Sequence, residues 1–145
     1  SDLLVEKIDP ISKDLYIITK RESPLRVYRL SFPQSISSDV TAEYVGGFSL
    51  PPKGQSPSSD WVSASDISRD GRRVLIKTYD NIYLLEKEPN EALGSVLSAN
   101  KTPIEYIPEP QGESVCWEWN NKGYYTISEE VRGIPAHLYY YHFTD

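Results

Sequence analysis

Residues 61–78 read WVSASDISRDGRRVLIKT, and this stretch decides the fold. Residues that favour β-strands lie on both sides of Asp70-Gly71, and an Asp-Gly pair between two such runs is a strong indication of a hairpin. Two similar stretches have their turns at Ser12-Lys13-Asp14 and Asn121-Lys122-Gly123. Counted between Asp14, Gly71 and Gly123, the turns are 57 and 52 residues apart. The sequence therefore repeats a strand–turn–strand unit three times.

Further strands are expected beyond each hairpin. They are residues 3–8, 14–20, 25–30 and 42–50 in the first unit, 61–67, 73–78, 82–86 and 103–107 in the second, and 114–119, 124–128 and 137–143 in the third. Several strands per unit, at a period near 50 residues, are typical of β-propeller blades. The expected fold class is therefore all-β: a β-propeller fragment of about three blades, spanning residues 3–50, 61–107 and 113–143.

One short helix is expected near residues 90–98, inside the second unit. Asn90 is of a residue type that caps helix N-termini. The apolar residues that follow, Ala92, Leu93, Val96 and Leu97, fall on one helical face.

The third blade lacks its outer strand in this sequence. Three blades do not close a ring, since propellers use about four to eight. An unpaired edge on Tyr139-Tyr140-Tyr141 and uncovered blade faces would favour association. We expect a second chain, or a second copy of this one, to complete the propeller. A compact three-sheet domain that covers its own edges is the alternative.

Composition excludes several classes of protein. The 145 residues carry a net charge of -6, which argues against binding nucleic acid or an anionic membrane surface, because both need a basic face. One cysteine, Cys116, excludes a disulfide framework and a cysteine-rich zinc site. The sequence has no methionine, no signal peptide and no long apolar run, so we expect a processed chain or a fragment.

Three stretches resemble a family of uncharacterised bacterial and invertebrate proteins that are expected to form six-bladed propellers. The residues concerned are 8–21 with 27–30, 64–74 and 109–114, and the resemblance extends over most of the chain. It implies that the chain corresponds to the C-terminal half of such a propeller. It implies no particular activity.

Two carboxylates are candidate metal ligands. Asp66 and Glu113 are expected at the start of inner strands in two blades, facing a central channel where a ring of oxygens could hold Ca²⁺. The alternative is that they accept backbone N–H bonds between blades. A calcium loop starting at Asp66 would need Glu at its twelfth position, which is Lys77 instead. No other cofactor is expected.

Trp117 and Trp119 share a strand face with Val115, so both are expected in the core between blades. A stacking platform for sugars is the alternative, since aromatic faces also serve as binding surfaces. Cys116 is expected to be a small buried residue. Asn100-Lys101-Thr102 is a glycosylation sequon, which matters only in a secreted eukaryotic protein.

Three functions agree with these observations. The first is a binding or interaction module that holds its ligand on a loop face or in the channel. The second is a metal-dependent hydrolase of the lactonase type, with Asp66 and Glu113 among the ligands. The third is a structural role in a secreted matrix, indicated by the acidity, the tyrosines and the sequon. We expect an extracellular or periplasmic location.

Overall fold

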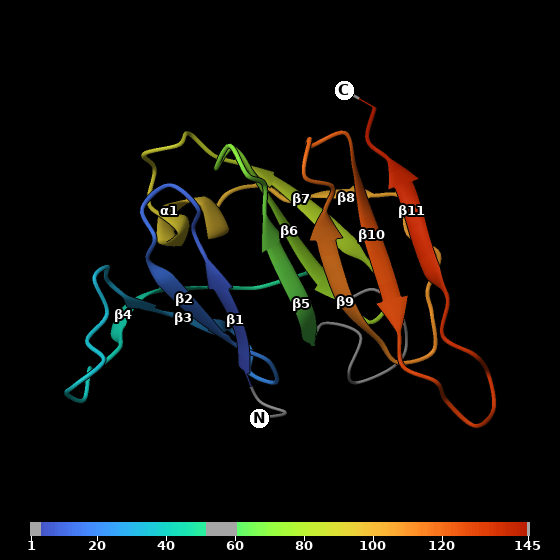
Figure 1. Ribbon diagram of the computed structural model, residues 1–145, viewed down its shortest axis with the longest axis horizontal. Coiled ribbons are helices and arrows are strands. Elements are labelled where there is room, and N and C mark those ends of the chain that lie inside the picture. Colours follow the sequence, from blue (N-terminus) through green and yellow to red (C-terminus); the bar gives the residue numbers. More distant parts are fainter. Residues whose placement is uncertain (1–3, 52–60, 145) are drawn as a thin grey trace.

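The computed structural model describes residues 4–51 and 61–144, which form three antiparallel sheets and one short helix (Figure 1). Sheet 1 contains β1 (Leu4–Ile8), β2 (Leu15–Thr19), β3 (Leu25–Leu30) and β4 (Glu43–Phe48). Sheet 2 contains β5 (Val62–Ile67), β6 (Arg73–Thr78), β7 (Ile82–Glu86) and β8 (Thr102–Ile104). Sheet 3 contains β9 (Gly112–Trp117), β10 (Gly123–Ser128) and β11 (Leu138–His142). The helix is α1 (Leu93–Leu97).

This arrangement confirms the all-β prediction of about three blade-like sheets, with three strands in the last. In every sheet the strands follow chain order, so each is a simple meander. The expected start of the first strand at residue 3 lies outside the described residues.

The three predicted turns close three hairpins in the same register. The last pair before each turn is Ile8↔Leu15, Ile67↔Val74 and Trp117↔Tyr124. Gly71 has a φ of +72°, a conformation that side chains disfavour, which explains a glycine after Asp70. The registers agree from each turn as far as the bulges at residues 62–64 and 127–128, so hairpin residues within that range have counterparts in the other two sheets.

The sheets fan out from their first strands, so that β1, β5 and β9 lie side by side in the middle of the molecule (Figure 1). We call these three the inner strands. One apolar core fills the space between sheets 1 and 2 and includes Val27, Ile76 and Leu97. A second, between sheets 2 and 3, is more aromatic, with the rings of Tyr124 and Tyr141 stacked at 5.2 Å.

The helix differs from the prediction. It is shorter than expected, and it begins after Ala92, which makes no side-chain capping bond, so Asn90 is not the cap. Its buried residues are Leu93, Val96 and Leu97, which pack into the first core. Packing therefore holds this helix in place, as is usual for helices too short to be stable alone.

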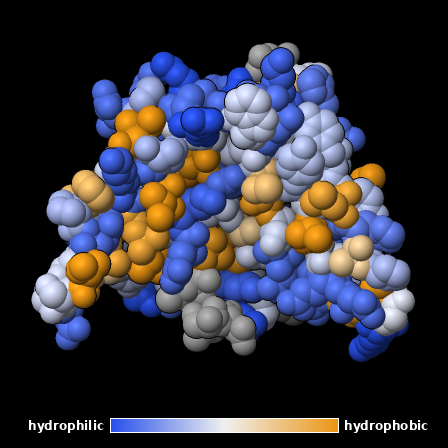
Figure 2. Space-filling view, in the orientation of Figure 1, coloured by the Kyte–Doolittle hydropathy of each residue, from blue (hydrophilic) through white to orange (hydrophobic). Residues whose placement is uncertain are grey.

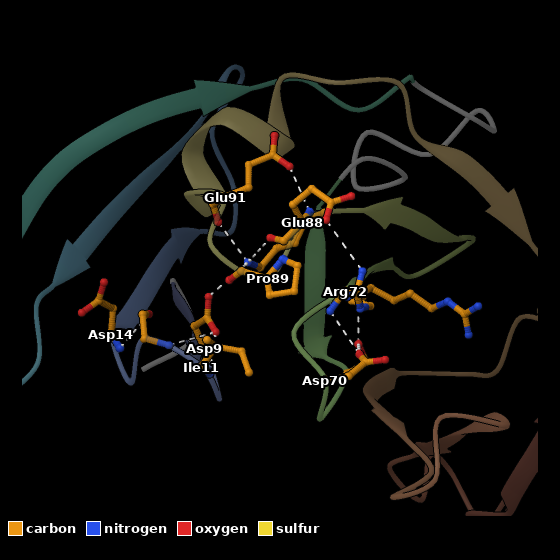
Figure 3. A network of polar contacts seen from close by, with 12 residues as sticks. Asp9, Ile11, Asp14, Asp70, Arg72, Glu88, Pro89 and Glu91 are labelled. Atoms are coloured by element: carbon orange, nitrogen blue, oxygen red, sulfur yellow. Dashed lines mark hydrogen bonds and ion pairs between the residues drawn. The ribbon is translucent and has the colours of Figure 1, made fainter.

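A buried lysine fixes the loop that leads to the helix. Lys87 Nζ donates hydrogen bonds to the carbonyls of Glu88, Pro89 and Glu91 and lies 3.5 Å from Asp9 Oδ2. Asp9 also accepts the backbone N–H of Ile11, so the carboxylate connects the β1–β2 turn to sheet 2 (Figure 3).

Candidate functional site

A cavity of about 630 Å³ opens where the inner strands end and their hairpin turns begin. Side chains from all three sheets line it. They include two cations, three carboxylates and an exposed indole: Lys7, Arg69, Glu6, Asp66, Glu118 and Trp119. Mixed charges beside an apolar wall of Ile8, Pro10 and Leu15 suit a small polar ligand that also has an apolar face.

Asp66 is the central residue of this cavity, and its carboxylate connects all three sheets. Asp66 Oδ1 lies 2.5 Å from Nζ of Lys7, a residue of β1, and it accepts the backbone N–H of Ile67 at 2.9 Å. Oδ2 accepts the backbone N–H of Trp117 in β9 at 2.6 Å. Asp66 therefore accepts a backbone N–H bond between two sheets, which was one of its two expected roles.

Glu113, the other predicted metal ligand, does not line this cavity. Its Oε1 accepts the hydroxyl of Tyr79 at 2.7 Å and lies 3.5 Å from Lys20 Nζ. Burial, followed by this bond to Glu113, raises the pKa of Tyr79 to about 12. The prediction that Asp66 and Glu113 occupy equivalent starts of inner strands is wrong. Asp66 is the fifth residue of β5, and its register counterpart in β9 is Cys116, three positions after Glu113.

That offset separates the two carboxylates by about 10 Å along the strands, at a rise of about 3.3 Å per residue. Each is also paired with a lysine, as described above. Within residues 4–51 and 61–144, no group of three or more His, Cys, Asp or Glu side chains could hold a metal ion. Metal binding by Asp66 and Glu113 stays a prediction, and this geometry does not favour it.

The two tryptophans that the sequence placed in one core have different environments. Trp117 is buried, and its ring packs edge-on against Tyr124 and Phe143 in the second core. Trp119 is 74% exposed, because β9 ends at Trp117 and the chain turns before position 119. Core packing is therefore correct for Trp117 and wrong for Trp119, whose ring is available to a ligand.

Cys116 is exposed, contrary to the expectation of a small buried residue. It belongs to the face of sheet 3 that no described residue covers. Partial burial and the nearby Asp66 carboxylate raise the pKa of its thiol. The thiol is therefore protonated at neutral pH and is not an activated nucleophile.

The sequence reasoning missed a buried charged cluster behind the inner strands. Lys77 is fully buried in β6, and its Nζ donates to the carbonyls of Thr78 at 2.9 Å and Gly112 at 2.5 Å. It lies 4.6 Å from the ring centre of Tyr106. Glu109 is buried nearby, and neither of its carboxylate oxygens has a hydrogen-bond partner among the described residues. A lysine in the apolar run Val74-Leu75-Ile76 was the indication in the sequence.

Asn100 of the sequon is exposed, between α1 and β8. A glycan there would not disturb either core. Its modification stays a prediction that depends on the source of the chain.

No protein-family model matches the chain, and no curated protein is significantly similar to it. Among the described residues, no helix has both the length and the apolar character needed to cross a membrane. The cavity is therefore the feature of the molecule that indicates a function.

Proposed function

We propose that the chain is a binding module whose ligand is a carbohydrate held in the cavity at the ends of the inner strands. The observation that carries this proposal is the ring of Trp119, which is 74% exposed at a cavity lined by charges of both signs. Sugars present apolar C–H faces that pack on aromatic rings, and hydroxyl edges that hydrogen-bond to charged groups.

The neighbours of Trp119 provide those hydrogen-bonding groups. Glu6 and Glu118 offer acceptors and Arg69 offers donors, although one Glu118 oxygen already accepts the hydroxyl of Tyr140 at 2.9 Å. Asp66 and Lys7 are already engaged with each other, so their role is to fix the cavity wall. A preformed wall lowers the entropy that the protein loses when a ligand binds.

The test is a titration of the chain with a panel of neutral, acidic and amino sugars, followed by calorimetry and by tryptophan fluorescence. We expect at least one class to bind, and Trp119→Ala to weaken that binding about five- to thirtyfold, as the loss of an aromatic contact of about 1–2 kcal/mol would do. Trp61→Phe is the matched control, because Trp61 lies outside the cavity, against the guanidinium of Arg21. Binding that survives Trp119→Ala, or an absence of binding across the panel, would overturn the proposal.

A further inference from the structure

The shared hairpin register gives each sheet two comparable faces. Ile67 and Trp117 are counterparts, and each points toward the preceding sheet in the fan, where they are 6% and 8% exposed. We call this side the back face of a sheet. Their counterpart in sheet 1 is Ile8, which has no preceding sheet and is 57% exposed.

The exposure of back-face residues in the second strands, β2, β6 and β10, differs between the sheets in the same way. Val74 and Tyr124 on the back faces of sheets 2 and 3 are 1% and 2% exposed. Their counterpart Leu15 in sheet 1 is half-buried. The back face of sheet 1 therefore keeps apolar residues at positions that the other two sheets bury completely.

The opposite side of each sheet, which we call the forward face, is uncovered in sheet 3. Val27 and Ile82 are counterparts that point toward the following sheet, and they are 1% and 0% exposed. The corresponding residue of sheet 3 is Leu138, which is 65% exposed. Ile127, at 41%, likewise corresponds to the buried Ile18. Figure 2 shows hydrophobic residues at the surface over both sheet 1 and sheet 3.

We propose that the forward face of sheet 3 packs on the back face of sheet 1 of a second copy, so that two chains placed head to tail close a six-bladed ring. The chain itself presents one free face of each kind. A two-fold axis along the centre of the fan then covers all four free faces with two identical interfaces. Each would continue the pattern by which sheets 1 and 2, and sheets 2 and 3, already pack.

The second copy would also reshape the cavity, because Ile8 and Leu15 belong both to the cavity wall and to the free back face of sheet 1. Successive inner strands touch through equivalent positions: Lys7 contacts Asp66, and Asp66 contacts the β9 backbone at Trp117. The next equivalent position is Cys116, which is exposed on the forward face of sheet 3. In the closed ring it would face Lys7 of the partner subunit. This inference does not depend on which ligand the cavity holds.

The first test is the molar mass of the chain in solution, measured by light scattering on a sizing column over a wide range of concentration. We expect a mass twice that of one chain. Ile8→Asp and Leu138→Asp should each weaken the dimer at least tenfold, because each places a charge in one half of the interface. Both positions are more than half exposed in the single chain, so the fold should survive. Ile36→Asp is the control, since Ile36 is fully exposed in the loop between β3 and β4.

A cross-link distinguishes head-to-tail closure from other dimers. In the Lys7→Cys variant, a disulfide to Cys116 of another chain doubles the mass under non-reducing conditions, whereas a disulfide within one chain leaves the mass unchanged. We expect a product of dimer mass that is lost on reduction and absent when Cys116 is also changed to Ser. A single-chain mass at every concentration would overturn the proposal. So would an Ile8→Asp variant that dimerises normally, because the interface would then involve two copies of sheet 3.

Discussion

The backbone N–H of Trp117 donates to Asp66 Oδ2 across a distance of 2.6 Å, joining the inner strands of two different sheets. The other oxygen of the same carboxylate pairs with Lys7 from the third sheet. Sheets that share no ladder hydrogen bonds are thus connected at the centre of the fan by one side chain. A pair between buried or half-buried groups is costly to break, because the group left behind loses its partner without regaining water.

Asp66→Ala should lower the free energy of unfolding by about 2–4 kcal/mol, because it leaves the Trp117 N–H and the Lys7 ammonium without their acceptor. Urea denaturation at neutral pH measures this directly. Glu43→Ala is the matched control, because it removes an ion pair in which Glu43 lies 2.7 Å from Arg29. The Glu43 side chain is 61% exposed, so the free energy of unfolding should fall by less than about 1 kcal/mol. Equal losses in the two variants would mean that Asp66 does not connect the sheets.

Lys87→Met should be among the most damaging substitutions of a charged residue. It removes the ammonium that three loop carbonyls share, and it leaves the Asp9 carboxylate buried without its cation. We expect a loss of about 3–5 kcal/mol. Hydrogen exchange should show faster opening of the residues around α1 and of the β1–β2 turn. Lys122→Met, at an exposed turn position, should change neither measurement.

Gly94→Ala tests whether close packing outweighs helix propensity. An alanine inside a helix is usually more stable than a glycine by about 1 kcal/mol. At Gly94, however, the added Cβ would lie 2.7 Å from the backbone carbonyl oxygen of Val45 in β4, which cannot rotate away. We therefore expect a net loss of about 1–2 kcal/mol in urea denaturation.

The control for this substitution lies in the same helix. Ser95 is exposed, and its side chain makes no hydrogen bond among the described residues. Ser95→Ala should therefore raise stability by up to about 0.5 kcal/mol. If Gly94→Ala also stabilised the chain, the contact between α1 and β4 would be looser than described.

The sequence was most informative where chemistry is local. The Asp70-Gly71 turn and its two relatives predict the hairpins, because a tight turn is specified by the residues within it. Period-two alternation says less about burial, because β5, β6 and β7 of the middle sheet are buried on both faces. Neither kind of pattern says where a strand stops. Trp119 was therefore assigned to the same face as Trp117, although β9 had already ended.

The candidate site was predicted less well because it depends on contacts between sheets. The sequence does not show how β5 and β9 are aligned relative to their hairpin turns, so Asp66 and Glu113 were predicted at equivalent positions. Cys116 was expected to be buried, but it lies on the forward face of sheet 3, where burial would require a further sheet. Lys77 was not recognised, since nothing in a linear sequence says that its amine reaches the carbonyl of Gly112, 35 residues away.

Lys77 also makes stability depend on pH in a direction that can be worked out. Burial is the main cause that lowers the pKa of Lys77 to about 8, and the Glu109 and Glu113 carboxylates partly oppose it. In the unfolded chain the same amine has a pKa of about 10.4. Between these two values the unfolded chain binds a proton that the folded chain does not. Stability should therefore rise from about pH 8 to about pH 10, by an amount on the order of 3 kcal/mol at most.

Two tyrosines reverse this trend at higher pH. Burial raises the pKa of Tyr79 and Tyr106 to about 12, so above about pH 10 the unfolded chain loses protons first and stability falls. The measurement is a series of urea denaturation curves across this range. Lys77→Met should remove most of the rise and keep the fall, whereas Lys122→Met should retain both. The small rise that remains comes from Lys101, whose pKa burial also lowers. A rise of unchanged size in Lys77→Met would mean that the buried amine of Lys77 stays protonated throughout.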